Sequence, residues 1–580
     1  MSNKQNNRYL SRTYRGFDGI DRAACHSDTS GARDCVNFRI REDGSLEKRC
    51  GYRFLTDVGG AIRAFYSTLE SQIPIGYLLV GNTAYRMNLL SGEKNALGTV
   101  STESGNACFF FYKGMLYLTD GATIYEYRNG TLTETVGYVP LIGKDWPCDI
   151  LGEPNEPRNL LNRHARISYR IGSPASIFLC TRYPVESVEA VYVNDVLISP
   201  ERYYIDDLFT TVNVKEPETG DRVTLHLTFR EAPYAASLAN LCTVTDSVLF
   251  GGIEQNRMFL YGGGAGSTVY CSSLVSSEQL AESVKHYSTS GPLYFPEGYA
   301  FTVGDGQSSA RGMLRHFDRL LIFTEKDTWM SASDASGMEE LPTLHINPDV
   351  GCPVFRGFTL AGNDPVTVGL DTVWRWTNDT DELNRCNAYS ISRPIDSLLA
   401  KTDYANLGLY YHRATDELWM YNRVSGRVWI YHVGKQRWYS YSGILADRLF
   451  DANGTVGFFR GSKFFLFDPS LTRDLESAEE SREIQATYLS GMTDFGSDKK
   501  KNLASLTLRA DTDTGGTLSV TLNGNGTAPV SCSFVSDADA EEHTILSRRL
   551  SSGRFQYATV RLTATGDARP IIHSLTLNTR

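Results

Sequence analysis

The chain has 580 residues, of which 41% are hydrophobic and 21% charged, and its net charge is −10 at pH 7. This length predicts two to four domains. The composition excludes wholesale disorder, and the acidic balance excludes a surface built throughout as a nucleic-acid clamp. An acidic protein can still surround DNA, because a negatively charged channel wall repels the DNA and lets it slide past without binding. The 32 Tyr, 27 Phe and 51 Gly favour strands joined by tight turns.

Targeting and redox signals are few. No apolar run approaches the roughly 18 residues of a membrane span, and the opening MSNKQNNRYLSRTYRG lacks the apolar stretch of a secretory signal. Eleven cysteines occur without a CxxC pair. We expect Cys108, Cys180 and Cys242 to lie in apolar strands as small hydrophobic residues. A reducing cytoplasm is the expected site of synthesis, with no disulfide framework.

The first motif along the chain is a hairpin at 36–54, VNFRIREDGSLEKRCGYRF. Asp43-Gly44 predicts a tight two-residue turn with positive φ angles. The hairpin concentrates basic side chains in an otherwise acidic chain, namely Arg39, Arg41, Lys48, Arg49 and Arg53. One interpretation is a docking element for an acidic neighbour or a phosphate backbone. The alternative is a solvated hairpin. Residues 1–60 are thus predicted to form an N-terminal arm that contributes to docking or to the next domain.

Seven later segments share a rhythm in which a strand and a polar turn precede a second, aromatic-rich strand. They are 75–92, 107–132, 241–263, 315–333, 365–379, 407–443 and 446–468. Their spacing of about 35–50 residues is the length of a four-stranded propeller blade. We therefore predict an all-β fold with a β-propeller of about seven blades over 61–150 and 235–478. Each unit has too little apolar surface to stand alone. The alternative is a set of unrelated hairpins in several sandwiches.

Two regions break this rhythm. Between 151 and 234, strict alternation at 188–193 and turns at Asn194-Asp195 and 219–221 predict an inserted β-sandwich. From 479 to 580 the short strands predict a C-terminal β-sandwich. The one helical candidate is 276–285.

Candidate catalytic and metal motifs are weak. Asp511 and Asp513 resemble the start of a calcium loop, but the expected Glu is missing, so a hairpin turn is preferred. The turn at 378–382 has the same interpretation. The glycines at 262–266 precede a strand rather than a helix, which indicates a turn and not a phosphate site.

Enzyme signatures are also weak. HExxH, HxH and GxSxG are absent from the sequence. Sialidase-like turns at 119–123 and 331–337 are partial. Paired carboxylates could still meet at a propeller axis, although the sequence identifies none. We predict a protein that is not an enzyme, with no catalytic, metal or cofactor-binding residue.

The N-terminal pattern resembles the opening of tailed-bacteriophage tail proteins. Its parts are Gly19-Ile20-Asp21, Asn37-Phe38 and the run 44–52, GSLEKRCGY, in which Cys50 stands where such proteins usually have Pro. The segment Thr493-Asp494-Phe495-Gly496 is similar to a "TG-x-x-DFG…K" segment near their ends. The run 191–203 resembles small sandwich modules of the same proteins.

This resemblance implies a structural protein of the virion tail, the hub or nozzle of a short tail, synthesised in the cytoplasm of a bacterial host. Six copies would form a ring below the portal and its adaptor, close the channel on packaged DNA without reading its sequence, and carry tail fibres. The net negative charge fits a DNA channel. The same signals fit another neck or tail-tip component. The alternatives are a receptor-binding or fibre-type protein that binds host glycan, and a propeller glycan hydrolase.

Overall fold

The computed structural model describes residues 7–11, 13–17, 31–148, 150–172, 177–179, 184–208, 210–230, 235–251, 256–304, 306–332, 343–377, 387–477, 479–535 and 544–580. Within them the chain is nearly all-β, as predicted, with many sheets and few helices. Cys180, Gly19-Ile20-Asp21, the turn at 378–382 and most of 331–337 lie outside the described residues.

Seven antiparallel arrays of four strands form the middle of the molecule. Six are separate sheets, and the other, β35–β38, is one end of a ten-stranded sheet. The first four arrays are β7 (Ile62–Glu70), β8 (Ile73–Val80), β9 (Thr83–Asn88) and β10 (Lys94–Thr99); β11 (Cys108–Tyr112), β12 (Met115–Thr119), β13 (Ile124–Arg128) and β14 (Thr131–Glu134); β23 (Asp246–Phe250), β24 (Arg257–Tyr261), β25 (Thr268–Cys271) and β26 (Ala300–Thr302); and β27 (Gly312–His316), β28 (Arg319–Phe323), β29 (Thr328–Ala332) and β30 (Thr343–Asn347).

The remaining three arrays are β31 (Phe358–Ala361), β32 (Asp364–Val368), β33 (Val373–Trp376) and β34 (Ala388–Ser390); β35 (Leu407–His412), β36 (Glu417–Asn422), β37 (Val428–His432) and β38 (Arg437–Tyr441); and β39 (Arg448–Asp451), β40 (Val456–Arg460), β41 (Lys463–Asp468) and β6 (Gly51–Asp57). Each of the seven rhythmic segments of the sequence falls in a different array.

The first strands of consecutive arrays are neighbours, from β7 through β11, β23, β27, β31 and β35 to β39. The circuit returns to its start through Phe65 of β7 and Phe450 of β39, whose ring centroids are 5.3 Å apart. The last array takes its fourth strand, β6, from the N-terminal part of the chain, and β6 pairs with β41. Residues 51–57 therefore complete the last array.

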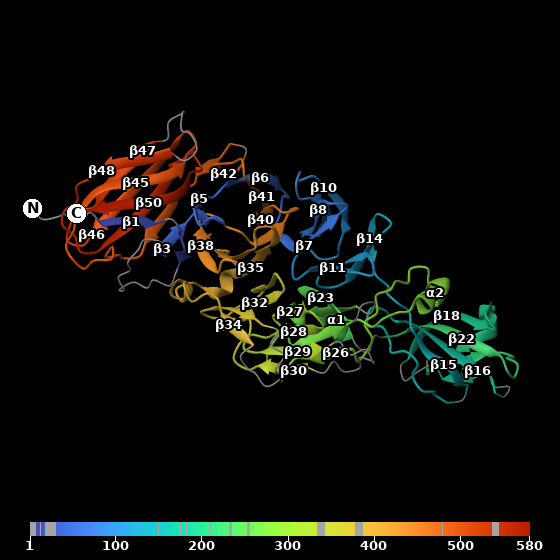
Figure 1. Ribbon diagram of the computed structural model, residues 1–580. Coiled ribbons are helices and arrows are strands. Elements are labelled where there is room, and N and C mark those ends of the chain that lie inside the picture. The colour runs from blue at the N-terminus through green and yellow to red at the C-terminus, as the bar shows by residue number, and fades with distance from the viewer. Residues whose placement is uncertain are drawn as a thin grey trace, which may run out of the picture.

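Residues 141–229 form two sheets at one end of the molecule (Figure 1). One sheet has the order β15-β16-β22-β18-β19 and the other β17-β21-β20. The bounds are β15 (Leu141–Pro147), β16 (His164–Arg170), β17 (Ile177–Leu179), β18 (Val185–Val193), β19 (Val196–Leu197), β20 (Tyr203–Ile205), β21 (Thr211–Val214) and β22 (Arg222–Phe229). A single apolar core joins both sheets. The predicted turn at Asn194-Asp195 is confirmed, with φ angles of 49° and 63°. The sheet begins at β15, earlier than the expected boundary at 151.

The opposite end of the molecule combines both ends of the chain (Figure 1). A six-stranded sheet has the order β4-β5-β50-β45-β48, with β1 also beside β50, and β3, β44, β49, β46 and β47 extend the ten-stranded sheet. The bounds are β1 (Asn7–Ser11), β2 (Gly16–Phe17), β3 (Gly31–Val36), β4 (Phe38–Ile40), β5 (Leu46–Lys48), β42 (Arg473–Leu475), β43 (Ser481–Glu483), β44 (Ala486–Ser490), β45 (Leu503–Asp511), β46 (Gly516–Gly524), β47 (Val530–Val535), β48 (Thr544–Arg549), β49 (Ala558–Gly566) and β50 (Ile571–Thr579). The N-terminal strands are thus integral to these sheets.

The described helices are short: α1 (Ala235–Cys242), α2 (Ser277–His286), α3 (Asp396–Leu399) and the 3₁₀ turns η1 (Pro200–Arg202), η2 (Gly263–Ala265), η3 (Tyr404–Asn406) and η4 (Arg413–Thr415). The predicted helix at 276–285 is confirmed, and a reciprocal capping box between Ser276 and Gln279 begins it. Cys242 ends α1, so its assignment to a strand was wrong. The eight described cysteines are free thiols. None of the described helices has the length and apolar character that a membrane crossing requires.

The β15–β22 unit should fold when it is excised with its first strand. Trp146 of β15 is 7% exposed and packs edge-on against Tyr169 of β16. We predict that a 139–233 fragment gives dispersed amide NMR shifts and that a 160–233 fragment is less stable by roughly 3 kcal/mol in urea, because the loss of a buried Trp costs that much. Collapsed shifts from the longer fragment would refute this.

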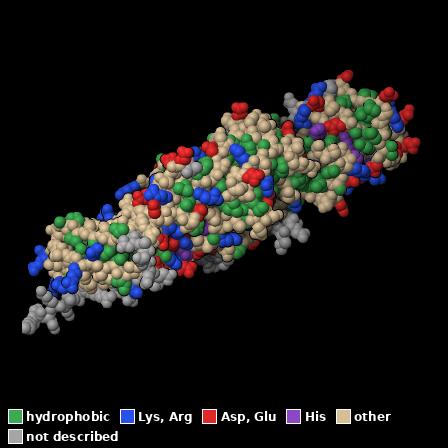
Figure 2. All heavy atoms as spheres, turned by 90° about the horizontal axis from the view of Figure 1, so that it is seen from above, with side chains coloured by type: hydrophobic (Ala, Val, Ile, Leu, Met, Phe, Trp, Pro, Cys, Tyr) green, Lys and Arg blue, Asp and Glu red, His purple; other side chains and the backbone are tan. Residues whose placement is uncertain are grey.

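Packed aromatic rings join this unit to the end of α2. His226 of β22 lies 4.6 Å from His286 of α2 and 5.3 Å from Tyr287, between ring centroids. Figure 2 shows histidines gathered toward this end of the molecule. Burial, followed by the charges of His286 and Arg166, lowers the pKa of His226 from 6.5 to about 3, against an opposing effect of Glu189. The fold therefore favours the neutral imidazole.

The neutral His226 predicts acid sensitivity. A depressed imidazole pKa contributes stability that is complete above pH 6.5 and is lost as the pH falls toward 3. At pH 4.5 the free energy of unfolding should be lower than above pH 6.5 by on the order of 2–3 kcal/mol. A His226→Phe variant keeps an aromatic ring without the titration, so its melting temperature should fall less between pH 7.5 and 4.5 than that of the parent. The more exposed His345→Phe control should behave like the parent. Equal acid sensitivity of all three proteins would contradict this explanation.

Candidate functional site

The basic hairpin lies where the seven-array body meets the terminal sheets, a region that we call the terminal junction (residues 31–51, 440–443, 473–475 and 485–490). Asn37 connects its parts. Its side-chain amide donates to the Gln485 carbonyl at 2.8 Å, and its Oδ1 accepts from Arg49 Nε at 3.0 Å and from the Ser442 amide at 2.9 Å. These contacts satisfy a buried amide, so Asn37 specifies how three distant segments meet.

Arg49 forms a buried bidentate ion pair in the terminal junction. Its Nη1 and Nη2 donate to the two carboxylate oxygens of Asp474 at 2.8 and 2.7 Å. The two side chains are 2% and 1% exposed. Arg482 also donates to Asp474, at 3.0 Å. A buried bidentate pair is costly to break because the remaining charge loses its partner.

The other cationic residues of the hairpin differ in their surroundings. Lys48 is buried and donates to the Gly566 carbonyl at 2.6 Å, and burial lowers its pKa to about 8. Arg39 Nε donates to Glu417 at 3.0 Å, and Arg53 donates to the Leu90 carbonyl at 3.0 Å. Lys48 and Arg49 therefore cannot form the expected docking face in this fold. Docking through the half-exposed Arg39, Arg41 and Arg53 stays a prediction.

The geometry of the motif explains its glycines. Gly44 has a φ of 82° and donates to the Arg41 carbonyl at 3.0 Å, while the Arg41 amide donates to Ser45 at 2.9 Å. The turn thus has three residues with one positive φ, so the two-residue prediction was wrong. A Cβ on Gly51 would lie 1.8 Å from the Arg473 carbonyl oxygen. Only glycine allows β6 to pass β42 at this distance.

The second motif of the resemblance also has a structural role. Phe495 is fully buried against Phe555, with ring centroids 6.0 Å apart. The Lys501 ammonium donates to the carbonyls of Asp494, Ser497 and Gln556. This segment stabilises the loop that precedes β45.

The turn after Asp511 does not close a hairpin. β45 belongs to the six-stranded sheet and β46 to the ten-stranded sheet, so 512–515 connect two sheets and the hairpin prediction was wrong. Asp511 accepts from His573 at 2.8 Å. Among the described residues no group of three or more His, Cys, Asp or Glu side chains could hold a metal ion.

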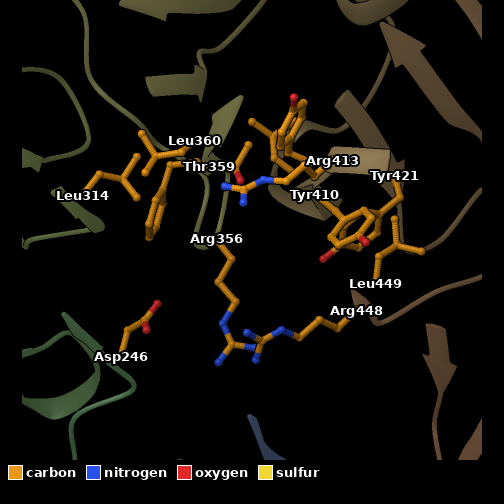
Figure 3. Close-up of a pocket in the computed structure, with 13 residues that line it drawn as sticks. Asp246, Leu314, Arg356, Thr359, Leu360, Tyr410, Arg413, Tyr421, Arg448 and Leu449 are labelled. Atoms are coloured by element: carbon orange, nitrogen blue, oxygen red, sulfur yellow. The ribbon is translucent and has the colours of Figure 1, made fainter. Parts of the chain in front are cut away.

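A cavity of about 530 Å³ lies among the first strands of five consecutive arrays, β23, β27, β31, β35 and β39. We call it the axial cavity. Arg356, from the turn before β31, and Arg448, at the start of β39, extend into it, and Asp246 of β23 lies on another wall (Figure 3). Among its described lining residues Asp246 is the one carboxylate.

The charges around the axial cavity favour the binding of a negatively charged group. Burial and the positive charge of Arg356 lower the pKa of Arg448 to about 10, although Asp246 acts in the opposite direction. Arg448 Nη1 donates to the Phe65 carbonyl at 2.7 Å. Sequence reasoning missed these residues because they are far apart in the chain and belong to no motif.

Comparison with known proteins adds little. No protein-family model and no curated protein matches the chain. Among solved structures, similar ones include the AfRom2 CNH domain, with 6% identity, a TM-score of 0.34 and coverage of 72% of this chain and 99% of that chain. An exo-β-1,3-galactanase from Phanerochaete chrysosporium has 8% identity, a TM-score of 0.25 and coverage of 92% and 100%. A chain of the mitotic checkpoint complex has 10% identity, a TM-score of 0.35 and coverage of 73% and 93%. None of these likenesses assigns a substrate or partner to the chain.

Asp474→Asn should strongly destabilise the protein. The substitution leaves Arg49 buried without a carboxylate, which costs about 3–5 kcal/mol of folding free energy. The urea concentration at the midpoint of unfolding should therefore fall. Asp567→Asn is the matched control, because Asp567 pairs with Arg473 at an exposed position, and this variant should keep the parent midpoint. Equal midpoints for the two variants would refute a structural role for the Arg49–Asp474 pair.

Proposed function

We propose that this chain is a structural protein of a tailed-phage virion and works as the hub or nozzle of a short tail. The observation that carries the proposal is the packing of the terminal junction. The described residues of the N-terminal motif that resemble tail proteins, Asn37-Phe38 and 44–52, form the contacts that join the two largest parts of the molecule. The resemblance therefore concerns residues that define the architecture rather than an isolated surface motif.

The assignment of the arrays to a β-propeller, and of the other sheets to two β-sandwiches, is part of the proposal. The seven arrays would be the blades of one β-propeller, since their first strands follow one another in a closed circuit and β6 completes the last array from the other end of the chain. The β15–β22 unit would be a β-sandwich inserted between the second and third blades. The terminal sheets would be a second sandwich.

A structural role is also favoured over catalysis. Glycoside hydrolysis usually needs two carboxyl groups about 5–10 Å apart across the bond that breaks. The axial cavity offers Asp246 together with arginines instead of a second carboxylate among its described lining residues. We therefore propose no enzymatic activity.

The proposed hub should assemble as a closed ring. We expect electron micrographs of the purified protein to show cyclic particles with a central opening, with six copies as the expected number, because a cyclic interface closes on itself. Native mass spectrometry gives the copy number. A protein that stays monomeric at all concentrations, and that binds or cleaves host glycans in a glycan-array assay, would contradict the hub. That result would favour the receptor-binding or hydrolase alternatives.

Arg41 tests docking separately from folding. Reversal of its charge in Arg41→Glu should reduce incorporation into phage particles in a complementation assay, because opposite charges orient neighbours during assembly. The melting temperature should change little, since Arg41 is half-exposed and charges that solvent reaches contribute roughly 0–1 kcal/mol to folding. Arg315→Glu, an exposed site on β27, is the control and should incorporate normally. Normal incorporation of Arg41→Glu would end the docking hypothesis.

A further inference from the structure

Arg356 and Arg448 of the axial cavity face one carboxylate, Asp246, among the described lining residues, so their two positive charges are not fully matched. Neither Arg356 nor Arg448 has a carboxylate oxygen of any described residue within 4 Å. Figure 3 shows that both side chains reach the same region from different elements, and the effect of Arg356 on the pKa of Arg448 shows that their charges interact. Two like charges in a half-buried space repel each other unless a negative group lies between them.

The same cavity contains buried donors without acceptors. The Nε of Arg356 and the hydroxyl of Tyr410 are buried, and neither has a hydrogen-bond partner. Both residues line the cavity. Burial, with a contribution from the charge of Asp451, raises the pKa of Tyr410, so its hydroxyl stays a donor. Unsatisfied buried donors cost free energy, and an oxygen-rich ligand would remove that cost.

The backbone of Arg356 and the guanidinium group of Arg448 are both held in place. Arg356 has a φ of 61°, an unfavourable conformation for a side chain that is not glycine, and its carbonyl accepts from the Leu409 amide at 3.3 Å. Arg448 is fixed by its hydrogen bond to Phe65. The strained backbone at Arg356 and the hydrogen bond of Arg448 are consistent with a site that needs little rearrangement to bind a ligand.

We propose that the axial cavity binds a phosphate- or sulfate-like oxyanion between Arg356 and Arg448, with Tyr410 as a further donor. Guanidinium groups bind such anions through paired N–H donors. The volume of about 530 Å³ lies in the range of roughly 300–1,000 Å³ that small-ligand sites occupy. The ligand is therefore either a free oxyanion or the phosphate group of a small phosphate monoester.

The test uses the full-length protein and inorganic phosphate. Phosphate should raise the melting temperature above that in chloride of equal ionic strength, and calorimetry gives the affinity. Arg356→Gln should weaken phosphate binding roughly tenfold or more, because a charged hydrogen bond contributes about that factor. In chloride alone the same variant should melt no lower than the parent, since it removes a repulsion. Arg315→Gln, outside the cavity, is the control and should bind as the parent does.

Two further variants keep the proposal testable if Arg356→Gln does not fold. Arg356→Lys keeps the charge without the paired donors, and Tyr410→Phe removes only the hydroxyl. Both should bind phosphate more weakly than the parent. Glucose 1-phosphate that binds more tightly than inorganic phosphate would indicate a monoester, and the reverse would indicate the free anion. Equal stabilisation by phosphate and chloride, or unchanged affinity in all Arg356 and Tyr410 variants, would overturn the proposal.

Discussion

The buried ion pair between Arg49 and Asp474 is the contact on which the architecture depends most. It lies just before β6, the N-terminal strand that completes the last array, and beside β3, which pairs with β44 of the terminal sheets. Two charges removed from water are costly unless their geometry is good and other groups share them. Arg482 and Asn37 provide this support. The pair therefore acts mainly to specify how the parts of the molecule meet.

The sequence predicted the strand content and the repeat accurately because both depend on local patterns. All seven rhythmic segments fall in different four-stranded arrays, and the turn at Asn194-Asp195 and the capped helix at 276–285 follow from local rules. The errors concern long-range pairing. The hairpin at 36–54 was expected at the surface because it concentrates basic side chains in an otherwise acidic chain. Its partners, Asp474, Glu417 and the Gly566 carbonyl, lie hundreds of residues away.

The terminal junction and the axial cavity differ in whether the sequence could identify them, and long-range pairing is again the reason. A resemblance to tail proteins identified residues of the terminal junction, although their role is internal. The axial cavity could not be found in this way, because Asp246, Arg356 and Arg448 come from three arrays and from unremarkable local sequences. The cavity collects residues from five arrays that are far apart in the sequence. The chemistry of such a cavity depends on strand order and is not readable from spacing.

Native-state hydrogen exchange tests the central claim, that the N-terminal segment couples the seven arrays to the terminal sheets. The account predicts that amides of β3, β6 and β44 exchange with the same opening free energy as those of β41, because these strands separate only when both parts open together. Exchange of β3 and β6 at a much lower free energy, while β39–β41 and β45–β50 stay protected, would contradict it.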